Sequence, residues 1–238
     1  MMTTTLPTHP RYLSFHWEMS EFWSGDLGLT LITISLVLLV FVITPLRTAG
    51  LPGRYMLDII MMFLMLYGAA KVEPSRVAKL LLIGLVALDA VVLGMARMNP
   101  SAFLNLLGSI FVTATLALYV RIILVVMFRG GPMRWSRIQG AVCAYMLLGM
   151  TWASAYQVLE QLRPTAFRFV TAPATFDELT SKLTYYSFCT LTTVGSDVTP
   201  LDPFARSLTT AESMTGQLFP AILIGALVAM AVQSRAKP

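Results

Sequence analysis

The chain has 238 residues, of which 56% are hydrophobic and only 12% are charged. Soluble proteins carry about 25% charged residues, so this composition indicates an integral membrane protein. The net charge of +5 comes from Lys and Arg residues scattered among short loops, with no basic–aromatic array, which argues against nucleic acid as a partner.

Apolar runs along the chain predict an all-α integral membrane protein with six transmembrane helices. The runs span residues 27–46, 55–70, 78–96, 102–128, 138–160 and 204–232. A spanning helix needs about 20 apolar residues, so only the second run is marginal. The segment before the first run lacks the basic start and small-residue cleavage site of a signal peptide, so we expect that run to be retained as a span.

These runs divide the chain into five expected parts. The parts are an N-terminal segment (1–26), a four-span membrane domain (27–128), a basic linker (129–137), a two-span domain (138–232) and a short tail (233–238). The positive-inside rule places the basic linker and the tail in the cytoplasm. The first two spans fit that rule less well, because Arg47 and Arg54 would lie outside. A five-span arrangement with an external N-terminus is the alternative.

The fourth run, residues 102–128, contains a single basic residue, Arg121. A voltage sensor needs several arginines at every third position, because each charge crossing the field contributes only about 2.3 kcal/mol per 100 mV. Residues 27–128 therefore resemble a degenerate voltage-sensor module, with Arg121 reaching the membrane interface. Asp58 and Asp89 lie in apolar runs, where charge is costly, and we expect them to pair with Arg121 or with each other, unless Asp58 reaches water.

Few residues in the chain suggest enzyme chemistry. Cys143 and Cys189 lie inside apolar runs and are expected to be packing residues, not a disulfide or a zinc site. His9 and His16 lie in the N-terminal segment, and no acid–base or metal cluster accompanies them. We therefore expect no enzyme activity and no cofactor.

The segment between the last two runs is too polar and too short to span. Residues 161–174 predict an external turret, and Thr175 and Glu178 form a candidate capping box that starts a helix at 177–191. The C-terminal end of that helix would carry a partial negative charge that favours a cation. The loop at 190–197 follows, and non-helical backbone in a bilayer must be buried in protein or line a watery path.

The loop and its flanks match one motif in register. Thr190, Thr193, Val194, Gly195, Asp197 and Pro200 match, in order, the pattern T-x-x-T-V-G-Y-G-D followed by Pro. Upstream, the Tyr-Tyr-Ser-Phe sequence at 185–188 fits a pore helix with its aromatic pair, and Arg206 and Gly216 follow at the pattern's distances. Residues 138–232 thus resemble the pore of the potassium-channel superfamily. Ser196 replaces the pattern's Tyr-Gly pair, so this loop is one residue shorter.

The resemblance implies a homotetramer, because such a pore needs four filter segments and the chain carries one. The ion-conduction filter would comprise Thr192, Thr193, Val194, Gly195, Ser196 and Asp197. Potassium ions are expected at the carbonyls of Thr193, Val194, Gly195 and Ser196. Tyr185, Tyr186 and Thr190 would support the filter from the pore helix. Asp197 would occupy the missing glycine's place in a left-handed conformation and attract cations at the outer mouth.

Two residues of the expected inner helix, 204–232, are candidates for a role in conduction or gating. Glu212 either lines the cavity as part of a ring of charge or hydrogen-bonds to the pore helix behind the filter. Gly216 is either a gating hinge or a position that permits close helix packing.

The sequence therefore predicts a tetrameric channel of the plasma (inner) membrane, in contact with lipid, that conducts K+ passively without strong voltage sensing. A non-selective monovalent cation channel that also passes Na+ is the alternative, because superfamily members that keep Thr-Val-Gly but lose the tyrosine admit sodium. A secondary transporter is the distant alternative, since transporters often show paired repeats and this chain has a single re-entrant element.

Overall fold

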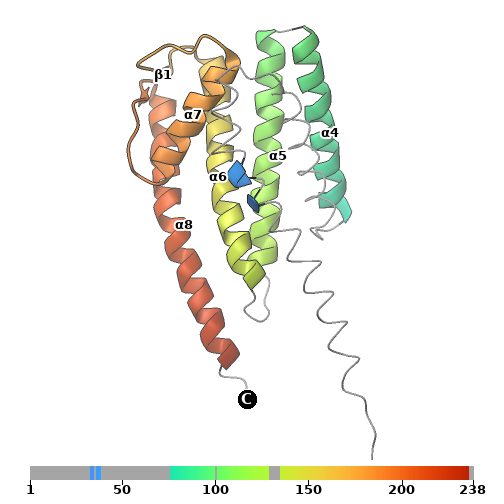
Figure 1. The fold of residues 1–238 in the computed structure, drawn as a ribbon, viewed down its shortest axis with the longest axis vertical. Coiled ribbons are helices and arrows are strands. Elements are labelled where there is room, and N and C mark those ends of the chain that lie inside the picture. The colour runs from blue at the N-terminus through green and yellow to red at the C-terminus, as the bar shows by residue number, and fades with distance from the viewer. Residues whose placement is uncertain (1–32, 35, 39–75, 100, 129–134, 236–238) are drawn as a thin grey trace, which may run out of the picture.

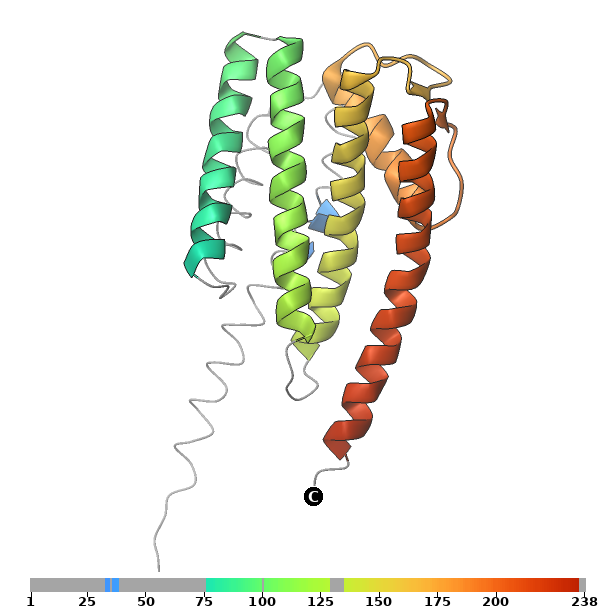
Figure 2. The ribbon, with the colours of Figure 1, turned by 180° about the vertical axis from the view of Figure 1, so that it is seen from behind.

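The computed structural model describes residues 33–34, 36–38, 76–99, 101–128 and 135–235. Their elements are helices α4 (Arg76–Met98), α5 (Ala102–Phe128), α6 (Trp135–Leu162), α7 (Phe176–Leu191) and α8 (Pro203–Arg235), and strands β1 (Phe167–Arg168) and β2 (Thr199–Pro200). Helices α4, α5 and α6 lie side by side, and α7 and α8 lie on the other side of α6 (Figures 1 and 2). The described part is mostly helical, as the composition predicts.

The third to sixth apolar runs all form helices, and the run at 102–128 has the predicted bounds. Ala102–Val125 and Ile138–Leu162 are long and apolar enough to cross a membrane, and Leu80–Ala96 is a shorter apolar helix. Most of the first run and all of the second lie outside the described residues, as do Asp58, His9 and His16.

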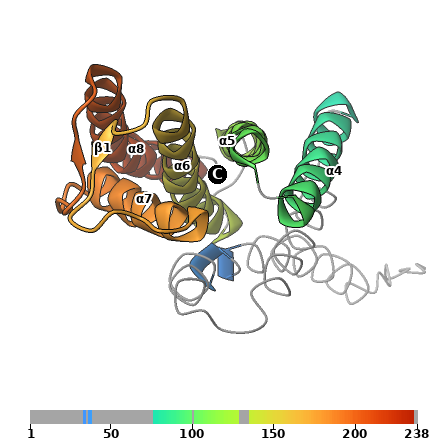
Figure 3. The same cartoon turned by 90° about the horizontal axis from the view of Figure 1, so that it is seen from above.

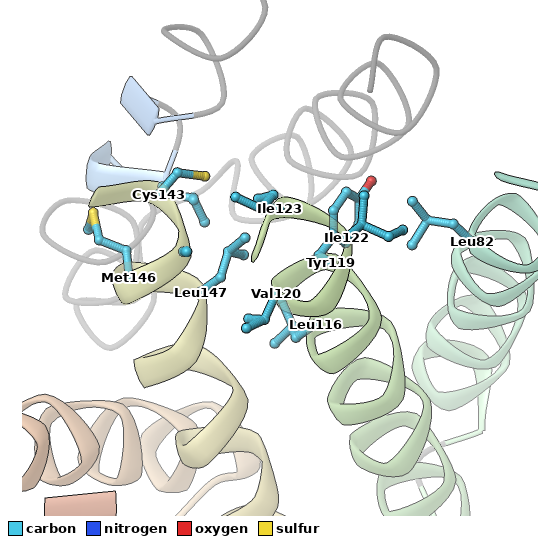
Figure 4. Packing of buried hydrophobic residues seen from close by; sticks show 11 residues of the cluster. Leu82, Leu116, Tyr119, Val120, Ile122, Ile123, Cys143, Met146 and Leu147 are labelled. Carbon is cyan, nitrogen blue, oxygen red and sulfur yellow. The ribbon is translucent and has the colours of Figure 1, made fainter. Parts of the chain in front are cut away.

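Side chains of α5 and α6 form the main apolar core. Figure 4 shows Leu116, Val120 and Ile123 of α5 facing Cys143 and Leu147 of α6. Because lipid is as apolar as these side chains, close van der Waals packing stabilises such a helix pair more than the hydrophobic effect does. Cys143 lies fully buried in this core as a free thiol, in agreement with its predicted packing role.

Hydroxyl groups add polar contacts between α5 and α6. Thr113 Oγ1 donates to Ser154 Oγ at 2.7 Å, and Ser154 Oγ donates to the Ser109 carbonyl at 3.1 Å. Gln161 Nε2 donates to Ser109 Oγ at 2.9 Å. Such interhelical hydrogen bonds fix the register of helices in an apolar medium, where unpaired polar groups are costly. Helix α6 is thereby held in place for its contacts with α7 and α8.

Asp89 and Arg121 do not form the ion pair that the sequence suggested. The ion pairs within the described ranges are Arg163–Asp202, at 3.0 Å, and Lys182–Glu178, at 2.9 Å. Arg121 is exposed on α5 and Asp89 is half-buried on α4. The predicted reach of Arg121 to the membrane interface stays a prediction.

The two short strands bring together the ends of one segment of the chain, residues 167–200, which is called the excursion below. Strand β1 pairs with β2 in antiparallel register, with Phe167 opposite Pro200 and Arg168 opposite Thr199. Between them the chain runs through α7, whose 16 residues extend about 24 Å at 1.5 Å per residue. The segment therefore travels along the bundle through α7 and returns in the loop that follows, to the point from which it left (Figure 1).

Aromatic packing and a helix cap hold the base of this excursion. The rings of Tyr156 on α6, Phe167 on β1 and Tyr186 on α7 form a triangle with centroid separations of 5.2 to 5.4 Å. Asp202 caps α8, because its Oδ1 accepts from the Phe204 N–H at 2.8 Å, and Pro203 stands at the first helical position, where its missing N–H costs nothing.

Candidate functional site

The start of α7 is fixed by a cap, as the sequence predicted, although the geometry differs. Thr175 Oγ1 accepts from the Glu178 N–H at 3.2 Å, but Glu178 Oε2 accepts from the Ala174 N–H, at 2.9 Å, instead of from that of Thr175. The Ala174 N–H, together with the ammonium of Lys182, holds the pKa of Glu178 below its usual value. The helix begins at Phe176, one residue before the predicted start.

The C-terminal carbonyls of α7 are all engaged by hydrogen bonds. The last four carbonyls of a helix have no partner within it. Here Phe188 accepts from the Thr192 N–H, Cys189 from the Val194 N–H, Thr190 from the Thr193 N–H and Leu191 from the Tyr145 hydroxyl. Three of the carbonyls that would form the negative end of the helix thus hold the start of the loop, and the fourth is bound by α6.

These hydrogen bonds orient the carbonyls of the loop. The N–H groups of Thr193 and Val194 point back to α7, with N···O distances of 3.1 and 2.9 Å. In a trans peptide the carbonyl points opposite to the N–H, and no described peptide bond is cis. The carbonyls of Thr192 and Thr193 therefore point away from α7, and the Thr192 carbonyl accepts from the Thr193 hydroxyl at 2.7 Å.

The loop takes an alternating backbone conformation at its centre. Thr193 has φ of 59° and Gly195 has φ of 92°, both in the left-handed region, with Val194 between them. Alternation of hand brings successive N–H groups to one side of the chain and their carbonyls to the other. Asp197 does not have a positive φ, contrary to the expectation that it replaces a left-handed glycine. The shorter loop places its left-handed residues at 193 and 195 instead.

The outer half of the loop forms hydrogen bonds within itself. Ser196 Oγ accepts from the Val198 N–H at 3.1 Å and lies 3.4 Å from Asp197 Oδ1. Asp197 is exposed, and Val198 is buried in the cluster around Tyr156. The side chain of Ser196 thus turns toward the backbone of the loop. It does not pack against a neighbouring helix as a bulkier side chain would.

The three residues predicted to support the loop take different positions. Tyr186 is buried, and its hydroxyl lies 2.6 Å from Thr209 Oγ1 of α8. Thr190 is buried, and its carbonyl accepts from the Thr193 N–H. Tyr185 is 56% exposed on the opposite side of α7. Of the three, Thr190 thus hydrogen-bonds to the loop and Tyr186 contacts α8, whereas Tyr185 is exposed; their role as supports of a filter stays a prediction.

Helix α8 crosses the end of α7 in close contact. A Cβ atom on Gly216 would lie 2.0 Å from the carbonyl oxygen of Leu191, so only glycine fits there. The next residue, Gln217, donates its amide to Thr193 Oγ1 at 3.1 Å. Of the two interpretations of Gly216, close packing is the one for which the structure gives the geometry. Gln217 was not among the residues predicted from the sequence, although its position beside Gly216 in an apolar run was an available signal.

A second glycine, Gly149, which was not predicted from the sequence, lets α7 approach α6. A Cβ on Gly149 would lie 2.8 Å from a ring carbon of Phe188. The Gly149 carbonyl accepts from Ser187 Oγ at 2.7 Å, and Tyr145, one turn earlier, reaches the Leu191 carbonyl at 3.3 Å. No pattern in the apolar sequence of α6 distinguishes these residues. Figure 3 shows α6, α7 and α8 grouped together, apart from α4.

Glu212 lies inside this three-helix group and not on an exposed face of α8. Its side chain is fully buried. Tyr156 of α6 donates to its Oε2 at 2.5 Å, and its Oε1 lies 2.5 Å from Ser187 Oγ of α7. Of the two predicted positions, the structure thus has the one in which the carboxyl group is hydrogen-bonded to α7, the helix before the loop.

Comparison with known proteins bears on this region of the chain. No curated protein and no solved structure matches the sequence. A family model described as an ion channel matches residues 155–233, which include the end of α6, the whole excursion with its loop, and nearly all of α8. The match supports an ion channel domain in this part of the chain.

Proposed function

We propose that the chain is one subunit of a homotetrameric, multi-pass cation channel of the plasma membrane that conducts K+ passively. The filter is the loop at 190–197, which would form one quarter of the pore. The carbonyls of Thr193, Val194, Gly195 and Ser196 would replace the hydration shell of the ion. The observation that carries the proposal is that two consecutive loop N–H groups, those of Thr193 and Val194, donate to carbonyls of α7, which turns the carbonyls of Thr192 and Thr193 away from that helix.

The exposed surface of the loop supports an assembly of several copies. Val194 is 78% exposed, and Met214, Leu218 and Ile222 of α8 are also exposed. A large apolar side chain at a filter is not expected to face water, so another surface should cover it. Four copies about one axis would place four loops together and cover these side chains.

The four-span domain would contribute little voltage sensing. Arg121 is one exposed charge on α5, and steep sensors use three to four gating charges in each subunit. The proposed channel therefore conducts over a wide voltage range.

A non-selective monovalent cation channel is the second candidate, and the position of Ser196 favours it. The Ser196 hydroxyl bonds to the Val198 N–H and does not reach the aromatic pair on α7. An unbraced outer carbonyl ring discriminates less well between ions of different size, so Na+ would also pass.

The test is cation flux in liposomes that contain the purified protein. A potassium gradient should drive uptake of a tracer cation without ATP or a counter-substrate, and the reversal potential under opposed K+ and Na+ gradients reports selectivity. Gly195→Ala should abolish flux, because φ of 92° is strained for any side chain. Gly225→Ala is the matched control, since a Cβ there meets nothing within 4 Å. Equal flux in both variants would contradict the assignment of the loop as the filter.

A further inference from the structure

Three helices meet at the carboxyl group of Glu212. The group comes from α8, Tyr156 donates to its Oε2 from α6 at 2.5 Å, and Ser187 of α7 lies 2.5 Å from its Oε1. Both distances are at the short end of the range for O–H···O hydrogen bonds, about 2.5 to 3.0 Å. Each carboxyl oxygen is therefore one partner in an O–H···O hydrogen bond, and one proton lies between the two oxygens of each pair.

The contacts of Ser187 show which residue supplies the proton between Ser187 Oγ and Glu212 Oε1. Ser187 Oγ lies 2.7 Å from the Gly149 carbonyl and 2.5 Å from Glu212 Oε1. A serine hydroxyl has one hydrogen, and a carbonyl can only accept. If Glu212 were ionised, Ser187 would have two acceptors and one hydrogen, and one of the two short contacts would bring two oxygens together with no hydrogen between them.

A proton on Glu212 Oε1 satisfies every contact. Oε1 then donates to Ser187 Oγ, Ser187 donates to the Gly149 carbonyl, and Tyr156 donates to Oε2. A continuous chain of hydrogen bonds would run from α6 through α8 and α7 back to α6. Such a network, with every member satisfied, fixes the relative position of the three helices.

Among the described residues, no basic side chain forms an ion pair with Glu212. The titratable groups that face it are tyrosine hydroxyls: Tyr156 and Tyr145 from α6, and Tyr186 from α7. The ion pairs within the described ranges, Arg163–Asp202 and Lys182–Glu178, do not include it. A buried carboxylate without a cation is costly, and such a group normally takes up a proton instead.

We propose that Glu212 is a neutral carboxylic acid that donates its proton to Ser187 and thereby acts as a positioning residue for α7. Ser187 lies one turn before Leu191, at the end of the helix that holds the loop. The protonation of Glu212 is inferred from the hydrogen-bond distances alone, whereas its effect on the loop rests on the proposed function of residues 190–197 as a filter.

Infrared difference spectroscopy of the full-length protein in liposomes tests the protonation directly. At neutral pH the wild type should show the carbonyl stretch of a protonated carboxylic acid. Glu212→Gln should remove that band, and Asp89→Asn, which changes the half-buried carboxyl of α4, should leave it in place. Ser187→Ala should shift the band, because the acid loses its acceptor. A wild type without the band, or a band that survives Glu212→Gln, would overturn the proposal.

The same variants test the positioning role. A glutamine amide can donate to Ser187 and accept from Tyr156, so Glu212→Gln should keep the wild-type potassium-to-sodium permeability ratio. Glu212→Asp retains the acid but is one methylene shorter, and it should change that ratio. A ratio altered by Gln and kept by Asp would mean that charge, not hydrogen bonding, matters at this position. The infrared band can be measured without ion flux. A protein that shows the band but conducts no ions would therefore contradict the proposed function and leave the protonation of Glu212 in place.

Discussion

Gly216 of α8 faces the Leu191 carbonyl at the end of α7, where an added Cβ would stand 2.0 Å from the oxygen. Leu191 is the last residue of the helix that holds the loop, so this contact fixes the distance between α8 and the candidate filter. Any side chain at 216 must push the two helices apart. Glu212 lies one turn earlier on the same face of α8, so the two residues together define how α8 sits against α7.

We expect Gly216→Ala to lower the free energy of unfolding by about 3 kcal/mol, since overpacking against backbone cannot be relieved by a side-chain rotation. Thermal unfolding in detergent should show a lower midpoint. Gly225→Ala, at a helical glycine with open space around it, should leave the midpoint unchanged. A stable Gly216→Ala protein with altered opening would favour the hinge interpretation over close packing.

Gln217→Leu should lower the potassium-to-sodium permeability ratio by about two- to tenfold, the equivalent of one hydrogen bond worth 0.5 to 1.5 kcal/mol. The amide donates to Thr193 Oγ1 at 3.1 Å, so its loss removes the tie between α8 and Thr193 and leaves that hydroxyl only its hydrogen bond to the Thr192 carbonyl, at 2.7 Å. Thr215→Val is the control, because the Thr215 hydroxyl bonds only to the Ala211 carbonyl of its own helix. Equal ratios in the two variants would mean that Gln217 does not act on the loop.

The helices were predictable from the sequence because long apolar runs can satisfy their backbone hydrogen bonds in lipid only as helices. The run at 102–128 has its predicted bounds, and the capping pair Thr175 and Glu178 placed the start of α7 to within one residue. Local chemistry determines these features.

Contacts between helices were not predictable in the same way. Glu212 had two possible positions, because the sequence does not show which neighbour covers each face of α8. Tyr145 and Gly149 belong to an apolar run with no marker. The left-handed conformation was expected at Asp197, from the alignment with the longer pattern. The structure has it at Thr193 and Gly195, since the hydrogen bonds from α7 determine the path of the loop.

Asp197→Asn should reduce conductance more at low salt than at high salt. The side chain is exposed beside the loop, and four carboxylates around one axis would concentrate cations at the outer mouth. Salt screens this attraction, with a Debye length of about 8 Å at physiological ionic strength. Single-channel currents at several potassium concentrations measure the effect. An equal fractional loss at every concentration would point to a distorted loop instead of a lost surface charge.

Replacement of Ser196 with Tyr-Gly should raise the potassium-to-sodium permeability ratio of the channel. Selectivity depends on the number and rigidity of the carbonyl rings, and in this chain the outer ring depends on a serine whose hydroxyl bonds to the Val198 N–H at 3.1 Å. A tyrosine could pack outward against an aromatic residue such as the exposed Tyr185 of a neighbouring copy, and the added glycine permits the backbone to turn. Reversal potentials under opposed gradients give the ratio. Ser196→Ala serves as the control, because it removes the Val198 contact without restoring the spacing. If the unmodified protein already excludes sodium strongly and the replacement brings no increase, the rings formed by Thr193, Val194 and Gly195 are sufficient, and the shortened loop is not the determinant of selectivity.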